Sequence, residues 1–114
     1  MKLVMLDAGT LGDDLSFDAL RELGDLTVYA STPSDEVVSR LDGCEVAILN
    51  KIKMTASVFD ACPHLRLVCL TATGFDNVDL EAARAHGVAV CNVPGYSTPS
   101  VVQVTLAMVL SLAT

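Results

Sequence analysis

The chain has 114 residues, of which 52% are hydrophobic and 18% charged, the size and apolar content of one folded domain with a core. Seven lysines and arginines against fourteen aspartates and glutamates leave a formal charge of -7, which disfavours binding to nucleic acid or to an anionic membrane surface. The longest apolar stretch, residues 101–113, is interrupted by polar residues and is shorter than the roughly 20 residues of a membrane-spanning helix.

Five short apolar runs follow one another along the chain, and each is rich in valine, leucine or isoleucine. They occupy residues 2–6, 26–29, 46–49, 65–70 and 88–93. The segments between them have helical spacing, and this alternation is typical of a parallel sheet covered on both faces. The sequence therefore predicts an α/β fold: a flavodoxin-like, doubly wound parallel sheet of order 2-1-3-4-5 with helices on both faces, in one domain over residues 1–114.

Capping residues and helix breakers delimit the first four expected helices, which end near residues 23, 41, 61 and 85. The residues that start or stop them are, in chain order, Asp14 or Ser16, Gly24, Pro33, Gly43, Pro63, Asn77 or Asp79, and Gly87. Side-chain oxygens suit helix starts, whereas glycine and proline suit the residues just past a helix end. We expect Asp76, Asn77 and Asp79 to be cap and turn residues rather than catalytic acids.

The last expected helix runs from about residue 98 to residue 114 and differs from the others. Large apolar residues surround it, at positions 101, 102, 104, 106, 108, 109, 110 and 112. A helix that is apolar all round is buried on all sides, so we expect one side to cover the sheet and the rest to meet a second partner. We therefore expect the chain to be a piece of a longer protein, with either a homodimer through residues 99–114 or a helix folded onto its own sheet.

The amino terminus reaches an acid, Asp7, after only four consecutive apolar residues. This run is too short for the core of a secretory signal, so the expected location is the cytoplasm. The four cysteines are Cys44, Cys62, Cys69 and Cys91. They form no C-x-x-C pair and have no histidine at metal-ligand spacing, so we expect reduced thiols in or near the core and no metal site.

Ligands of parallel α/β sheets bind at the carboxyl ends of the strands, so the loops after the third, fourth and fifth runs are candidate sites. Lys51 and Lys53 place two of only three lysines in one loop, which suits a small anion, although an ordinary solvated loop explains them equally well. Thr73-Gly74 is a small-residue turn whose amides can approach a carboxylate closely, although an ordinary left-handed turn explains it equally well. Asn92 offers a side-chain amide at the end of the fifth run.

The stretch ATGFDNVDLEAARAHGVAVCNVPGYSTPSVV over residues 72–102, with Asn50-Lys51 upstream, resembles the D-isomer-specific 2-hydroxyacid dehydrogenases. Within that family it is most similar to the glycerate dehydrogenase or hydroxypyruvate reductase branch. The resemblance extends over essentially the whole chain. It implies an NAD(P)-dependent oxidoreductase that acts on a small 2-hydroxy or 2-keto acid.

The resemblance also implies roles for single residues. The loop at Thr73 and Gly74 would offer main-chain amides to the substrate carboxylate, and Lys51 would line the substrate pocket. Asn92 would lie at the strand end that faces the reacting centre. Residues from 100 onward would match the helix that joins the substrate-side domain to the nucleotide-binding domain and packs in the family's dimer.

Other family features are not matched by any residue here. The turn from Gly9 to Gly12 lacks the full G-x-G-x-x-G pattern, and no residue matches the family's catalytic arginine, glutamate and histidine. His64 and His86 are expected to be surface or capping residues. We therefore expect a substrate-side domain with no catalytic residue and no cofactor of its own, inactive as an isolated fragment, with NAD(P) and the missing nucleotide-binding domain belonging to the parent enzyme.

A stand-alone flavodoxin-like binding or interaction module is the alternative. A phosphorylated receiver domain would have an aspartate after the third strand and a lysine after the fifth, where this chain has Asn50 and Asn92. A flavin carrier would have a phosphate-binding loop after the first strand, of which Gly9-Thr10 is only a fragment. The sequence does not distinguish which 2-hydroxy acid is bound, or NAD from NADP.

Overall fold

The computed structural model describes residues 1–12 and 16–93. Three of the sequence expectations lie outside the described residues: a helix start at Asp14, the helix from about residue 98 to residue 114, and the dimer contact through residues 99–114.

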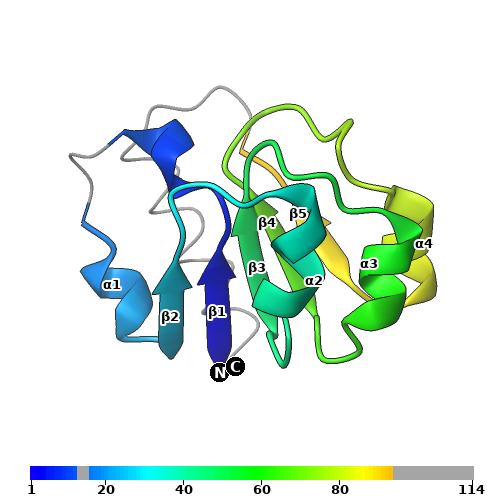
Figure 1. Ribbon diagram of the computed structural model, residues 1–114, viewed down its shortest axis with the longest axis horizontal. Helices are drawn as coiled ribbons and strands as arrows, with labels where there is room; N and C mark the ends of the chain where they lie inside the picture. The colour runs from blue at the N-terminus through cyan, green and yellow to red at the C-terminus, as the bar shows by residue number, and fades with distance from the viewer. Residues whose placement is uncertain (13–15, 94–114) are drawn as a thin grey trace.

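Five strands form one parallel sheet (Figure 1). They are β1 (Lys2–Met5), β2 (Asp25–Val28), β3 (Val46–Leu49), β4 (Leu67–Leu70) and β5 (Ala89–Cys91). Their order is β2-β1-β3-β4-β5, and every neighbouring pair is parallel. The predicted fold class and strand order are confirmed, and each strand starts within two residues of its apolar run.

The buried side chains form two layers, one on each face of the sheet. Successive residues of a strand point to opposite faces, so Ala47 and Leu49 of β3 pack in one cluster while Val46 and Ile48 pack in the other. All four residues of β3 are fully buried. A continuous apolar run, rather than an alternating one, is therefore what the sequence of this central strand requires.

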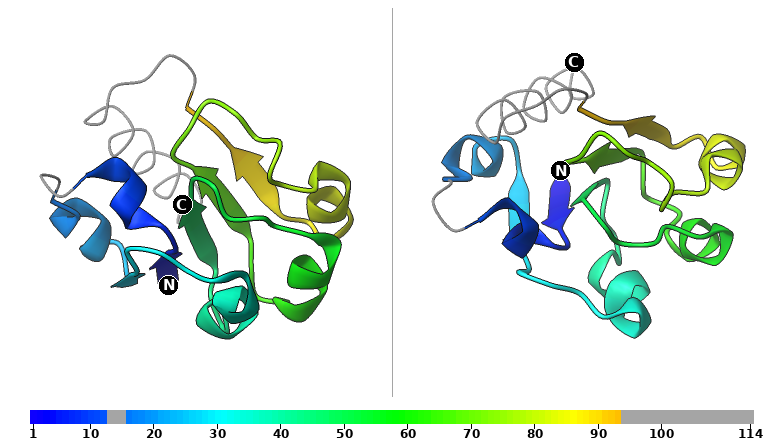
Figure 2. Two further views of the ribbon diagram at one scale, coloured as in Figure 1. Left: turned by 45° about the horizontal axis from the view of Figure 1, so that its top comes forward. Right: turned by 90° about the horizontal axis from the view of Figure 1, so that it is seen from above.

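Four short helices and two 3-10 turns connect the strands. They are η1 (Ala8–Leu11), α1 (Asp18–Arg21), η2 (Ser34–Glu36), α2 (Val37–Arg40), α3 (Ala56–Ala61) and α4 (Leu80–Ala85). Helices α2, α3 and α4 lie along one face of the sheet and α1 along the other (Figure 2). Helices of four to six residues have little stability of their own, so packing on the sheet holds them.

The helix starts differ in part from expectation. Asp79 is the N-cap of α4, and its carboxylate accepts a hydrogen bond from the Ala82 N–H at 3.0 Å, as predicted. Asn77, the alternative start, has another role that is described below. Pro33 precedes the 3-10 turn η2 instead of lying in a first α-helical turn, and Phe17 rather than Ser16 is the N-cap of α1.

The cysteines are free thiols, as predicted: Cys44, Cys62 and Cys69 are buried and Cys91 is half-buried. Burial raises the pKa of Cys44 to about 11 and that of Cys69 to about 12. His64 is exposed, and His86 is exposed as the C-cap of α4. In residues 1–12 and 16–93 no cluster of metal-ligating side chains occurs, and no helix is long and apolar enough to cross a bilayer.

Candidate functional site

An open pocket lies where the loops leave the carboxyl ends of β3 and β4. It has a volume of about 280 Å³ and is called the Lys51 pocket below. Its lining residues are Asn50, Lys51, Ala72, Gly74, Asp76 and Asn77. The structure thus brings together Lys51 and Gly74, two of the four residues predicted to bind substrate, from loops that are more than twenty residues apart in sequence.

Gly74 contributes open space to the Lys51 pocket. Its backbone does not have a positive φ, and a Cβ atom placed on it would meet nothing within 4 Å. The left-handed turn that could have explained this glycine is therefore wrong, since any residue fits its backbone conformation. In the part of the chain that the structure describes, no group accepts a hydrogen bond from the Thr73 or Gly74 N–H. Gly74 lines the pocket together with Lys51, and Thr73 directly precedes it in the chain.

Thr73 and Asn92 join the loop after β4 to the end of β5. The Asn92 side chain donates a hydrogen bond from Nδ2 to the Thr73 carbonyl at 2.7 Å. The Thr73 hydroxyl donates to the Val93 carbonyl at 3.2 Å, and the Val93 N–H donates to the Ala72 carbonyl at 3.1 Å. These bonds fix the backbone of residues 72 and 73, so the two predicted residues act on the shape of the loop.

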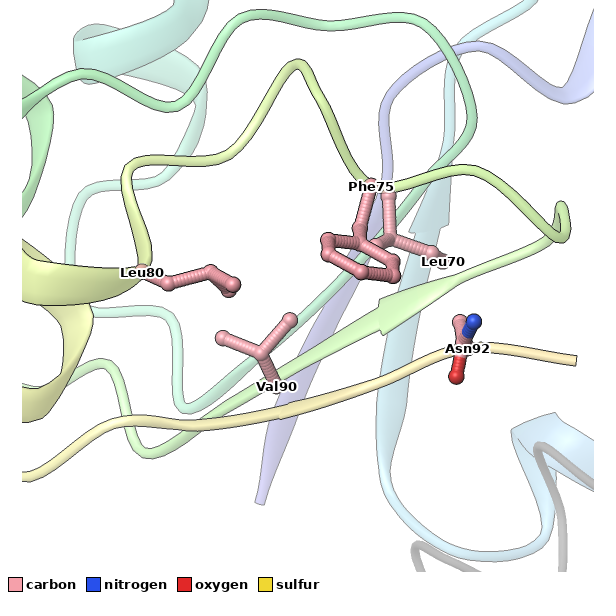
Figure 3. A pocket seen from close by; sticks show the side chains of 5 residues that line it. All are labelled: Leu70, Phe75, Leu80, Val90 and Asn92. Atoms are coloured by element: carbon pink, nitrogen blue, oxygen red, sulfur yellow. The ribbon is translucent and has the colours of Figure 1, made fainter.

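Asn92 itself lines a neighbouring pocket, which Figure 3 shows. This pocket has a volume of about 190 Å³, and its other side chains are apolar: Leu70, Phe75, Leu80 and Val90. Phe75 and Leu80 are 46% and 45% exposed, which is unusual for large apolar side chains among residues 1–12 and 16–93. The structure therefore does not place Asn92 in the same pocket as Lys51 and Gly74.

Two further residues shape the Lys51 pocket, and the sequence reasoning missed both. Asp7, two residues past the end of β1, is buried, and its carboxylate accepts hydrogen bonds from the Asn50 and Lys51 N–H groups at 2.8 and 2.7 Å. Asn77 donates from Nδ2 to the carbonyls of Asn50 and Ile52 at 3.1 and 2.7 Å. The only signal for Asp7 in the sequence is an acid at the end of an apolar run.

The charges around the pocket are mixed. Lys51 is exposed and brings a positive charge, while Asp76 brings a carboxylate to the same lining. Lys53 lines an adjoining pocket of about 170 Å³ that Lys51 also borders. The Lys51 ammonium and the main chain of Gly74, which line one open space, suit a small anion with a single carboxylate.

Neither histidine of the described residues lines this site. His64 lies in a pocket at the opposite edge of the sheet, with Gly43 and Arg66. His86 bonds to the carboxylate of Asp60 on α3. The lining of the Lys51 pocket therefore contains a carboxylate and an ammonium but no imidazole for proton transfer at neutral pH.

The turn after β1 does not fit the phosphates of a dinucleotide. The Gly9 N–H donates to the Ala30 carbonyl at 3.0 Å, and a Cβ atom on Gly9 would lie 2.8 Å from that oxygen. This glycine therefore serves the close approach of two backbone segments, and its amide is already used. A phosphate-binding turn needs amides that point freely at the ligand.

Comparison with known proteins gives a consistent result. Residues 6–111 match the family model described as D-isomer specific 2-hydroxyacid dehydrogenase, catalytic domain. The chain is 38% identical to a hydroxypyruvate reductase of Blautia hydrogenotrophica, over 98% of this chain and 36% of that protein. It is also 38% identical to a glycerate dehydrogenase of Methylorubrum extorquens, over 74% of this chain and 27% of that protein.

A solved structure of an NAD-dependent formate dehydrogenase from Staphylococcus aureus in complex with NAD has a similar fold. Its TM-score is 0.63 at 25% sequence identity, over 84% of this chain and 32% of that one. The chain thus spans about a third of the length of the curated relatives that it matches.

Proposed function

The chain belongs to the D-isomer-specific 2-hydroxyacid dehydrogenase family, and from this premise we propose that it is the substrate-side domain of an NAD(P)-dependent oxidoreductase. Its proposed substrate is a small 2-hydroxy or 2-oxo acid of the glycerate and hydroxypyruvate type. The names of two relatives, a hydroxypyruvate reductase and a glycerate dehydrogenase, support this choice.

The observation that carries the proposal is the open main chain at Gly74 beside Lys51. In this proposal the N–H groups of Thr73 and Gly74, which donate to no group among the described residues, donate to the carboxylate of the acid. The Lys51 ammonium compensates the remaining negative charge, and Asp76 on the same lining disfavours a second one. This arrangement favours a monocarboxylate and fixes the position of the carbon next to it.

The remaining chemistry is assigned to other parts of the parent enzyme. NAD(P), when bound, supplies the site that takes or gives the hydride. Because the Gly9 turn does not fit phosphate, we propose that a separate nucleotide-binding domain holds the cofactor. The role of residues 1–114 is then to bind and orient the acid, without turnover of their own.

Two further proposals come from the sequence alone. Residues 99–114 contact either the nucleotide-binding domain or a second copy of the chain, because their apolar side chains surround the expected helix. The proposed compartment is the cytoplasm, because the apolar run before Asp7 is short. Both stay predictions.

Binding of the acid tests the proposal directly. We expect hydroxypyruvate, added to the isotope-labelled chain, to shift the NMR amide signals of Lys51, Thr73 and Gly74. Dihydroxyacetone, which lacks the carboxylate, should leave them in place. The Lys51→Met variant should bind hydroxypyruvate about tenfold more weakly, since it loses a charged hydrogen-bond donor.

The matched control is Lys2→Met. Lys2 lies at the other end of the strands, where its ammonium donates to the Asp42 carbonyl, so its loss should not change the affinity. Equal effects of the two substitutions, or no signal shifts with hydroxypyruvate, would contradict the proposed function. Rapid oxidation of NADH by the chain with hydroxypyruvate would contradict the separate cofactor domain.

A further inference from the structure

The segment from Asn50 to Ile52 is held from two sides by side chains of other loops. On one side the two oxygens of the Asp7 carboxylate accept from consecutive amides, Oδ1 from Asn50 at 2.8 Å and Oδ2 from Lys51 at 2.7 Å. Both bonds are charge-assisted and Asp7 is only 7% exposed, so the contact is strong and shielded from water.

On the other side the Asn77 amide donates to the carbonyls of Asn50 and Ile52. Asp7 therefore accepts hydrogen bonds from N–H groups of the segment, and Asn77 donates hydrogen bonds to its carbonyl groups. The two residue types are not interchangeable: an amide nitrogen at position 7 would face an N–H, and a carboxylate at position 77 would face two carbonyl oxygens. Each side chain matches the polarity of the backbone that it meets.

The downstream end of the segment is also fixed. The Met54 N–H donates to the Asn77 carbonyl at 2.8 Å, and the Asp79 N–H donates to the Met54 carbonyl at 2.9 Å. Met54 is completely buried. Between these fixed points Lys51 is exposed and lines the pocket.

A surface loop does not need this many side-chain hydrogen bonds to its backbone. Water can satisfy the backbone groups of a surface loop, whereas burial of a carboxylate opposes folding unless its bonds compensate. The ladder of β3 ends at Ile48 with β1 and at Leu49 with β4, so the two side chains act on the loop beyond the sheet. Their common effect is to fix the backbone from which the Lys51 side chain projects.

We propose that Asp7 and Asn77 are positioning residues that hold residues 50–52 so that the Lys51 ammonium faces the bound carboxylate. The inference rests on the proposed function of the Lys51 pocket. Asp7 does not line the pocket, and Asn77, which does, donates from its side-chain nitrogen to the Asn50 and Ile52 carbonyls. Each acts through Lys51, so removing either one removes the contribution of Lys51 to binding.

A double-mutant cycle on the full chain tests this. Asn77→Ala, Lys51→Met and the double variant are titrated with hydroxypyruvate. Each single substitution should weaken binding about tenfold, and the double variant should be close to either single one instead of about a hundredfold weaker. Additive losses would show that Asn77 acts independently of Lys51 and would overturn the inference.

A control separates positioning from general loss of stability. Asp79→Ala removes the N-cap of α4, two residues from Asn77, and should lower the thermal stability without changing the affinity for hydroxypyruvate. An equal loss of affinity in Asp79→Ala would show that any weakening of this region has the same effect, and would also overturn the inference.

Asp7→Asn provides a second readout that needs no ligand. In the unchanged chain the Asn50 and Lys51 amides should exchange slowly with solvent deuterium, and in Asp7→Asn they should exchange at least about tenfold faster while the amides of β3 stay protected. Equal exchange in both would overturn the role of Asp7. Absence of hydroxypyruvate binding by the unchanged chain would refute the proposed function, whereas binding with an additive cycle would refute only this inference.

Discussion

Gly74 and Gly24 show two different reasons for a glycine. A Cβ atom on Gly74 would meet nothing within 4 Å, so neither packing nor backbone conformation requires glycine there. A Cβ atom on Gly24 would collide with the carbonyl oxygen of Met1 and lie 2.9 Å from the Leu3 side chain. The fold needs Gly24, whereas only the openness of the Lys51 pocket depends on Gly74.

The same substitution at the two sites should therefore give opposite results. Gly74→Ala should change the free energy of unfolding by less than about 1 kcal/mol and weaken hydroxypyruvate binding about tenfold or more, because its methyl group narrows the approach to the amides. Gly24→Ala should lower the free energy of unfolding by about 1–3 kcal/mol. Urea unfolding and ligand titration measure the two effects, and unchanged affinity in Gly74→Ala would count against the carboxylate site.

Single residues were predictable where their partners are close in sequence. Asp79 was recognised as a helix cap because it bonds to an amide three residues away. The roles of Asp7 and Asn77 were not recognised, because their hydrogen-bond partners lie 43 and 27 residues away and no local sequence pattern indicates these contacts. A single aspartate after a strand can have many structural roles, so the residue type alone does not identify its role.

At the level of elements, α3 and α4 are joined through His86. Its Nε2 lies 2.7 Å from the Asp60 carboxylate on α3, and its Nδ1 lies 2.8 Å from the Ala82 carbonyl on α4. The Phe59 ring stacks against the imidazole with centroids 6.1 Å apart. The Ala82 carbonyl and then Asp60 raise the pKa of His86 above its usual value.

This contact should make stability depend on pH. The pKa of His86 is higher in the folded chain than in the unfolded chain. The stabilisation that His86 gains from its two bonds is therefore fully present below the unfolded pKa of 6.5, and it is lost as the pH rises through the folded pKa. Asp60→Asn should therefore destabilise the chain more at about pH 5.5 than at about pH 8.5. Urea unfolding at both values checks this.

Asp18→Asn, on α1 at the opposite face of the sheet, is the matched control and should give no such difference. A destabilisation by Asp60→Asn that is the same at both pH values would mean that the ion pair does not contribute.

Elements were easier to predict than their ends. The five strands follow from apolar runs, because burial on both faces leaves a strong compositional signal, as in β3. The helices within residues 16–93 have only four to six residues, so a change of one cap residue shifts a large part of each of them. The 3-10 turn η2 after Pro33 is an example, since proline suits the start of either kind of turn.

At the level of the whole molecule, each face of the sheet contains a thiol that can report on unfolding. Cys44 belongs to one buried cluster and Cys69 to the other, and they are 0% and 1% exposed. Burial raises the pKa of both thiols well above neutral pH, so neither forms a reactive thiolate in the folded chain.

Alkylation of Cys44 and Cys69 should therefore follow unfolding of the whole chain. Leu49→Ala, which empties space in a fully buried strand, should lower the free energy of unfolding by about 2–5 kcal/mol and speed labelling of both thiols by roughly thirtyfold or more. Iodoacetamide labelling followed by mass spectrometry measures both sites. Faster labelling of only one of them would show that the two faces of the sheet open independently.

The strand order could be predicted because crossover connections between parallel strands have one preferred hand, and few arrangements of five strands satisfy this preference.

The pocket could be predicted only in part. Lys51 and Gly74 lie together, because strand ends meet at one edge, but Asn92 lines the neighbouring pocket. Which loop residues share a cavity depends on backbone contacts such as the bond from Asn92 to Thr73, which no periodicity records.

The parallel sheet also separates the loops at the amino ends of its strands from the loops at their carboxyl ends. Loops around Gly43 and His64 lie at the amino ends of β3 and β4, a full strand length of roughly 13 Å from the Lys51 pocket. A fluorescent dye attached through a cysteine at position 64, or an affinity tag inserted there, would leave the carboxyl-end loops untouched. The architecture thus offers an attachment point for a label that lies away from the proposed carboxylate site.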